Sequence, residues 1–163
     1  MKKLLFSILL GSSACAMQSG CASAEERAAR AAEQAAKVTK ALEARDYKIA
    51  VNRMYPMKGS SRSVSYGYSV EVRNDSLISY LPYFGGAYNV PYGGGKGLNF
   101  SERIGSYRES QKNNGERQIE INVTNEEDTY IYLIKVFSNG NSSIDVTSRQ
   151  RDHISYSGEL EVK

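Results

Sequence analysis

The sequence predicts a mainly β protein: about eight antiparallel strands forming a sandwich or a curled, barrel-like sheet, preceded by one N-terminal helix. Two observations carry this prediction. From Tyr47 onward apolar and polar residues alternate with a period of two, which is typical of strands with one buried face. Short runs rich in Asn, Asp and Gly separate the alternating segments and are suited to tight turns. The sandwich and the barrel-like sheet remain alternatives.

Residues 1–24 have the pattern of an export signal. Lys2 and Lys3 precede an apolar run at residues 4–10, and small residues follow. The run is too short to span a bilayer as a stable anchor. This order of regions predicts an exported protein that is periplasmic or anchored to the outer membrane.

Three processing sites compete in this leader. Residues 22–24 (Ala-Ser-Ala) form a site for ordinary signal peptidase before Glu25. Cys15 and Cys21 each follow small residues that resemble a lipoprotein site, so each is a candidate for lipidation. Simple secretion and a lipid anchor remain alternatives, and we expect contact with a membrane only through such an anchor. The chain after residue 24 has no cysteine, so it folds without a disulfide.

Residues 25–45 are expected to form an Ala-rich helical spacer. Its residues are mainly Ala, Glu, Lys, Arg and Gln, all strong helix formers. Its narrow apolar stripe ends in Val38 and Leu42, which we expect to contact the following domain. Alanine at most seam positions argues against a self-associating coiled coil. Two pairs stand at the favourable i,i+4 spacing, Glu26–Arg30 and Glu33–Lys37.

Residues 46–163 are expected to form the β-domain, beginning with a strand at residues 47–52. Residues 64–72 alternate over their whole length and predict a second strand. A turn at residues 74–75 (Asn-Asp) then leads into a strand at residues 77–81. In the last strand, Gly158 interrupts the alternation, which predicts a β-bulge.

Turn chemistry predicts the register of two later hairpins. A three-residue loop at residues 113–115 (Asn-Asn-Gly), with Gly115 left-handed, places opposite charges on the solvent face. A three-residue loop is also expected at residues 139–141. Residues 130–137 are apolar on both faces, which predicts a central strand that is covered on its second face. The expected pairs are Tyr107–Ile121, Arg108–Glu120 and Lys112–Glu116 in the first hairpin, and Val136–Ile144, Ile134–Val146 and Lys135–Asp145 in the second.

The stretch of residues 80–95 differs from the strands around it. Aromatic residues alternate there with prolines and glycines, which break strands. The rings either fold back over one end of the core or form a recognition surface, since rigid aromatic side chains on loops are common in binding sites. The candidate ligand-binding residues are Tyr80, Tyr83, Phe84, Tyr88 and Tyr92.

Residues 80–88 (Tyr-Leu-Pro-Tyr-Phe-Gly-Gly-Ala-Tyr) and 91–94 (Pro-Tyr-Gly-Gly) resemble the signature of the domain of unknown function 4251 family. The resemblance covers residues 41–162 and includes a Pro-Met-x-Gly turn at residues 56–59. That family consists of extracytoplasmic proteins of Bacteroides-like bacteria. The resemblance therefore implies a fold and a location, but no reaction.

The sequence shows no residue pattern typical of a catalytic or metal-binding site. His153 is the one histidine, and residues 152–153 (Asp-His) are expected to form a solvated turn. The acidic cluster at residues 125–128 indicates a turn between strands, without the spacing of a metal site. Residues 93–97 are rich in glycine but lack the spacing of a phosphate loop. We predict no enzyme, no cofactor and no metal site.

Charge narrows the class of partner. Without Lys2 and Lys3, 19 of the 21 basic residues remain and nearly balance the 18 acidic ones, which argues against nucleic acid. We expect a non-catalytic envelope protein that binds a peptide, a glycan or an envelope protein through the aromatic stretch. A purely structural or assembly module is the alternative, followed by a small hydrolase with dispersed carboxylates.

Overall fold

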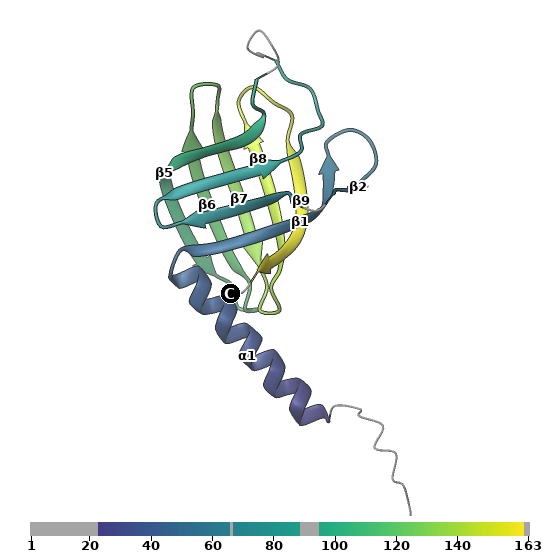
Figure 1. Ribbon diagram of the computed structural model, residues 1–163, viewed down its shortest axis with the longest axis vertical. Helices are drawn as coiled ribbons and strands as arrows, with labels where there is room; N and C mark the ends of the chain where they lie inside the picture. The colour runs from purple at the N-terminus through teal and green to yellow at the C-terminus, as the bar shows by residue number, and fades with distance from the viewer. Residues whose placement is uncertain (1–22, 66, 89–94, 162–163) are drawn as a thin grey trace, which may run out of the picture.

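The computed structural model describes residues 23–65, 67–88 and 95–161. In these residues one helix, α1 (Ala24–Glu43), is followed by nine antiparallel strands (Figure 1). The strands are β1 (Asp46–Pro56), β2 (Arg62–Ser63), β3 (Ser69–Arg73), β4 (Ser76–Leu81), β5 (Leu98–Gln111), β6 (Arg117–Thr124), β7 (Thr129–Val136), β8 (Asn141–Ser148) and β9 (Ile154–Glu161).

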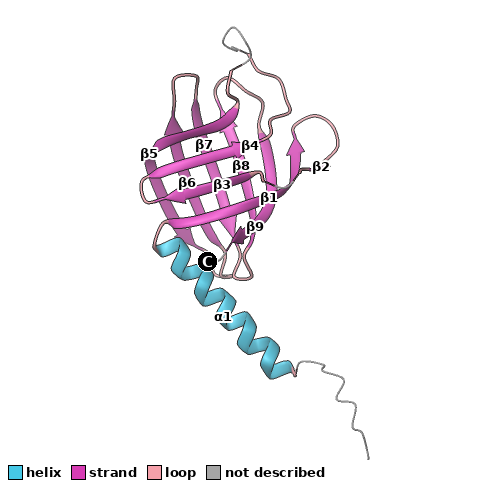
Figure 2. Cartoon of the chain, in the orientation of Figure 1, coloured by secondary structure: helices cyan, strands magenta, loops and turns pink. Residues whose placement is uncertain are grey.

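Eight of these strands form a closed, barrel-like sheet (Figure 2). From β3 to β9 each strand pairs with the next in the chain, and β1 closes the sheet by pairing with both β3 and β9. The short strand β2 pairs with the far half of β1. The mainly β prediction is therefore confirmed, and the barrel-like alternative is the observed one.

Side chains fill the interior of the barrel, as in other eight-stranded barrels. Tyr47, Tyr130, Tyr132 and Tyr156 are fully buried among aliphatic side chains from the surrounding strands. The hydroxyl of Tyr132 donates a hydrogen bond to Ser79 Oγ (2.9 Å). Because the interior is packed, the outside of the barrel is where a ligand can be bound.

Connections between strands gather at two ends of the barrel. The end that α1 contacts has the tight turns between β3 and β4, β5 and β6, and β7 and β8 (Figure 1). The opposite end, called the loop end below, has the longer connections. These are the segments flanking β2 (57–61 and 64–68) and residues 82–97, 125–128 and 149–153.

Helix α1 begins with a capping box. The Ser23 hydroxyl accepts a hydrogen bond from Glu26 N (3.1 Å), and the Glu26 carboxylate accepts one from Ser23 N (3.2 Å). Glu26 is thus used for capping rather than for the predicted pair with Arg30. The predicted Glu33–Lys37 ion pair is present, at 2.7 Å.

Only the last turns of α1 pack on the barrel. Val38 and Leu42 are buried in the core, which confirms their predicted contact with the β-domain. The first turns extend away from the sheet (Figure 1). Along the described residues, no helix has both the length and the apolar character needed to cross a bilayer.

The β5–β6 hairpin has the predicted loop and register. Tyr107 lies opposite Ile121, and Gly115 has a φ of 79°. The ion pairs Arg108–Glu120 and Lys112–Glu116 are both present, at 3.2 Å. Because the pairing of opposite charges distinguishes one register from its neighbours, the sequence determined this hairpin.

The β7–β8 hairpin is shifted by two residues from the predicted register. Its loop is residues 138–140, because Phe137 N donates to Asn141 O (2.9 Å) and Gly140, with a φ of 91°, closes the loop. The prediction placed this glycine in the middle of the loop and was wrong. The observed pairs are Ile134–Ile144, Val136–Ser142 and Leu133–Asp145, although the predicted ion pair between Lys135 and Asp145 still forms, at 3.8 Å.

Two further strand predictions need correction. The segment 64–72 is not one strand, since β3 begins at Ser69 and Gly67 has a φ of 110°, which extended backbone does not adopt. The second face of β7 is not covered either. Ile131 on that face is 42% exposed, because a barrel buries only one face of each strand.

The predicted bulge beside Gly158 is present, but the extra residue belongs to the partner strand. The register shifts between Val51 and Arg53 of β1, opposite Gly158 and Ser157 of β9. A Cβ atom at Gly158 would lie 2.0 Å from the carbonyl oxygen of Ala50. Only glycine allows β9 to approach β1 this closely.

Candidate functional site

Aromatic side chains are exposed at the loop end. Tyr80 is 52%, Phe84 44% and Tyr88 73% exposed. The ring of Tyr80 stacks on that of Tyr68, with 5.1 Å between centroids. The guanidinium of Arg62, on β2, lies 4.2 Å from the centroid of Phe84. Three of the five candidate rings thus present large surfaces to solvent.

The other two candidate rings differ. Tyr83 is half-buried against the core, and its hydroxyl donates to the carbonyl oxygens of Gly86 (2.7 Å) and Asp152 (3.2 Å). The hydroxyl of buried Tyr156 donates to Pro82 O (2.7 Å). Tyr83 therefore fastens the aromatic stretch to the barrel. Tyr92 lies outside the described residues.

The carboxylate of Asp152 ties the aromatic stretch to the β8–β9 turn. It accepts hydrogen bonds from Gly86 N (2.9 Å) and the Tyr88 hydroxyl (2.8 Å). The hydrogen bond from Gly86 N, and to a smaller extent the one from the Tyr88 hydroxyl, hold the pKa of Asp152 below its usual value. The hydrogen bond to Asp152 raises the pKa of Tyr88. Residues 152–153 lie in the β8–β9 connection without forming a turn of their own, and Asp152 is a structural tether rather than a solvated side chain.

The turn of residues 125–128 is also a tether. The carboxylate of Asp128 is buried and accepts from the backbone N–H groups of Arg149 (3.2 Å) and Gln150 (3.0 Å). The carboxylate thereby satisfies donors in the β8–β9 connection that would otherwise lack partners. The predicted turn is confirmed, and its role in holding a neighbouring connection is a structural finding.

Glu127 joins the same turn to two other connections. Its Oε1 atom accepts from Lys96 N (2.8 Å), and its Oε2 atom accepts from Arg151 Nη2 (3.2 Å). Arg151 lies 5.5 Å from the ring centroid of Tyr83. Tethers of this kind are hard to find from sequence, because a carboxylate after a strand does not reveal which distant backbone group it meets.

A groove of about 300 Å³ lies beside Tyr80 at the loop end. Its lining combines aromatic rings with hydrogen-bond donors, a combination typical of ligand sites. Asn99 Oδ1 accepts from Leu81 N (3.1 Å), which fixes the amide and leaves its NH₂ group for a ligand. The side chains that give the groove this character are Tyr68, Tyr80, Tyr83, Lys96, Asn99 and Arg151.

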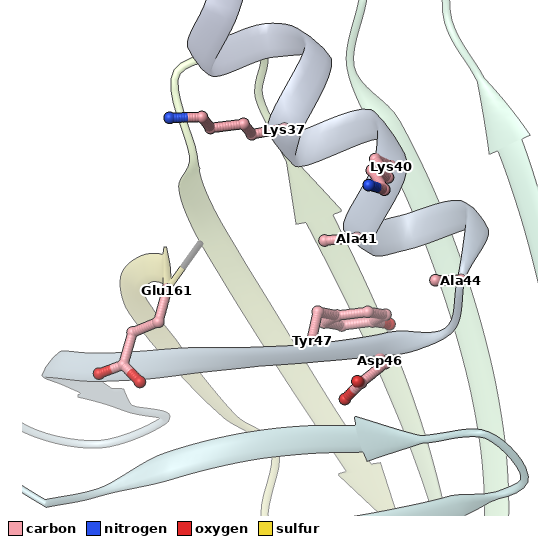
Figure 3. Close-up of a pocket in the computed structure, with 7 residues that line it drawn as sticks. All are labelled: Lys37, Lys40, Ala41, Ala44, Asp46, Tyr47 and Glu161. Carbon is pink, nitrogen blue, oxygen red and sulfur yellow. The ribbon is translucent and has the colours of Figure 1, made fainter. Parts of the chain in front are cut away.

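A second hollow, of about 350 Å³, lies between α1 and β1 (Figure 3). Its lining ring, Tyr47, is almost wholly buried. Two of the four charged residues that line it are already paired, Lys37 with Glu33 (2.7 Å) and Glu161 with Lys48 (3.1 Å). This hollow therefore lacks the exposed ring face that the loop-end groove offers a ligand.

The surroundings of His153 do not have the arrangement of a hydrolytic triad. Its Nε2 atom is 3.0 Å from Ser155 Oγ, but Ser155 itself donates to Asp145 (2.6 Å). The other ring nitrogen meets Thr147 Oγ1 (3.3 Å), where a triad has a carboxylate. Within the described part of the chain, no three His, Cys, Asp or Glu side chains are grouped as metal ligands.

Comparisons with known proteins concern the whole β-domain. A family model described as "Domain of unknown function (DUF4251)" matches residues 29–160. The chain is also similar to the crystal structure of a DUF4251 family protein from Bacteroides eggerthii, with a TM-score of 0.62 and 15% identity over 81% of this chain and 89% of that chain. At this identity the likeness shows a shared fold. The curated proteins gave no match.

Both acid and alkali are expected to release the tether between Asp152 and Tyr88. The folded-state pKa of Asp152 is lowered, so its contribution to stability is present above the usual aspartate pKa of 3.8 and is lost as the pH falls through the lowered value. The pKa of Tyr88 is raised above 10.0, so its contribution is lost as the pH rises through that raised value. The NMR shift of the Gly86 amide proton should be constant between about pH 5 and 9 and change outside this range.

Asp152→Asn is the matched control, because an amide keeps an acceptor oxygen but does not titrate. The acid transition of the Gly86 signal should disappear in this variant. An acid transition of the same size in Asp152→Asn would contradict the assignment of the tether to this carboxylate.

Proposed function

The chain belongs to the DUF4251 family, and we propose that it is an exported, non-catalytic binding protein whose loop-end groove binds a glycan of the cell envelope. One observation carries the proposal: the exposed ring of Tyr80 borders a groove that is also lined by the amide of Asn99 and the side chain of Lys96. A sugar has an apolar C–H face that packs on an aromatic ring and hydroxyl groups at its edges that accept such hydrogen bonds.

Two features favour a glycan over a peptide or a folded protein partner. Extended peptides commonly bind by adding a strand to a free sheet edge, but the eight described barrel strands close on one another. Free edges among the described strands include those of the two-residue strand β2 and of the second half of β5 (104–111), which pairs with β6 alone and runs toward the α1 end, away from the groove. The groove is also small, at about 300 Å³, which suits one or two sugar rings better than a folded partner.

The tethers of the loop end support a binding role. Asp152 holds the backbone of Gly86, Glu127 holds that of Lys96, and Tyr83 bonds the aromatic stretch internally. Side chains on fixed backbone lose less conformational entropy when a ligand binds. The exposed rings are thus held in place before a ligand arrives.

For location, we propose export with a lipid anchor on a cysteine of the leader. Cys15 and Cys21 lie outside the described residues, and the supporting observation is the capping box at Ser23 and Glu26. Cleavage after Ala24 would remove this N-cap, at a cost of about 1 kcal/mol in helix stability. Processing at either cysteine retains it, and α1 then holds the barrel about 30 Å from the lipid.

Labelling with palmitate in a Bacteroides host tests the anchor. The wild-type protein should incorporate label, and one of the two variants Cys15→Ser and Cys21→Ser should lose it while the other retains it. The variant that loses label identifies the acylated residue. A wild-type protein without label, whose mature N-terminus is Glu25 by mass spectrometry, would contradict the anchor and support simple secretion.

A glycan array followed by titration tests the binding role. Tyr80→Ala should weaken binding of the selected glycan at least about tenfold, because the stacking face is lost. Its Tm should change little, because half of the Tyr80 side chain is already exposed. Phe137→Ala is the control, since Phe137 is an exposed ring at the α1 end of the barrel and should not affect binding.

The alternatives predict other outcomes of the same experiment. If the rings serve a purely structural or assembly role, no glycan binds and Tyr80→Ala changes only stability or association. If a peptide is the ligand, a peptide library yields binders that depend on Tyr80 and the glycan array yields none.

A further inference from the structure

The charged side chains that line the loop-end groove are cations. Among the described residues these are Lys96 and Arg151, and no carboxylate lines the groove with them. The adjoining hollow has the opposite character, because Lys96 is there accompanied by Glu102, Glu126 and Glu127. The positive lining is therefore a local property of the groove, on a chain whose overall charge is nearly balanced.

Arg151 is fixed in a rigid setting. Only 7% of its side chain is exposed, its Nη2 atom is bound to Glu127, and its guanidinium lies over the ring of Tyr83. Its buried Nε–H group has no hydrogen-bond partner in the described structure. Of the buried side-chain atoms without a partner, this is the one that belongs to the lining of the groove. A buried donor left unused is uncommon and calls for an explanation.

Neighbouring carboxylates do not neutralise both cations. Glu127 offers one charge, and its two oxygens are occupied by Arg151 and by the backbone of Lys96 rather than by the Lys96 side chain. Asp152 is turned toward Gly86 and Tyr88. Lys96 shares the adjoining hollow with Glu102 and Glu126, but among the described residues its ammonium group forms no ion pair with them, so it is available to an anionic group of a ligand.

We infer that the groove binds an acidic sugar, a residue carrying a carboxylate such as a uronic acid. The sugar ring lies on the exposed face of Tyr80, and the carboxylate lies toward Lys96 and Arg151. A planar carboxylate matches the forked donors of a guanidinium, and the Asn99 amide is left for a sugar hydroxyl. This inference rests on the proposed glycan-binding function and specifies its ligand class.

Matched ligands test the charge requirement directly. The probes are uronic-acid oligosaccharides and the same oligosaccharides with methyl-esterified carboxylates, which keep the sugar ring but lose the charge. The acids should bind at least tenfold more tightly than the esters, and the difference should shrink as salt is raised. Esters or neutral glycans that bind as tightly as the acids overturn the inference but leave the proposed function standing. Binding of no glycan overturns both.

Protein variants assign the effect to the two cations. Lys96→Gln should reduce the ratio of acid to ester affinity at least threefold. Arg151→Ala would leave Glu127 buried without its partner, so the second variant is the double change Arg151→Gln with Glu127→Gln, which removes both charges together. It should reduce the ratio at least threefold while the ester still binds, because the guanidinium donors are lost but the charge of Lys96 remains.

Lys40→Gln is the control, because Lys40 lines the hollow beside α1 instead. It should leave the ratio unchanged. If the double variant does not fold, as judged by circular dichroism, Lys96→Gln decides the question alone. A ratio that stays at its wild-type value in Lys96→Gln and in the folded double variant would overturn the inference.

Discussion

The close approach of β9 to β1 is the constraint on which the rest of the structure depends. The two strands pair from Lys48–Glu161 to Pro56–Ile154, and Gly158 lies so near Ala50 that a side chain has no room there. This pairing turns a meander of strands into a closed barrel. Closure leaves each strand with one buried face and gathers the connections at two ends, so the end opposite α1 is available for binding.

A second layer of interactions gives the loop end its shape. Three carboxylates, those of Glu127, Asp128 and Asp152, each accept one or two backbone N–H groups from a connection other than their own. Hydrogen bonds to charged acceptors are stronger than neutral ones, and loops held in this way present their side chains in fixed positions. The exposed rings and the cations of the groove owe their arrangement to this layer rather than to the packing of the core.

The sequence could predict the fold because its determinants are local. The alternation of apolar and polar residues predicted the strands, and charge pairs such as Arg108–Glu120 selected one register for the β5–β6 hairpin. The β7–β8 hairpin was harder, because several registers keep its apolar residues inside and only the left-handed Gly140 selects the observed loop. The site was partly predicted. Its exposed rings stand out in the sequence, whereas Asp152 meets Gly86 across 66 residues, and no local pattern encodes that contact.

The free energy of unfolding of Gly158→Ala tests the closure most directly. The added methyl group would lie 2.0 Å from Ala50 O, so β1 and β9 must separate, and we expect a loss of at least about 2 kcal/mol. Glu159→Ala, at an exposed position beside it on the same strand, should change stability by less than about 0.5 kcal/mol. Equal stabilities for Gly158→Ala and the wild type in denaturant titrations would contradict closure of the barrel at this point.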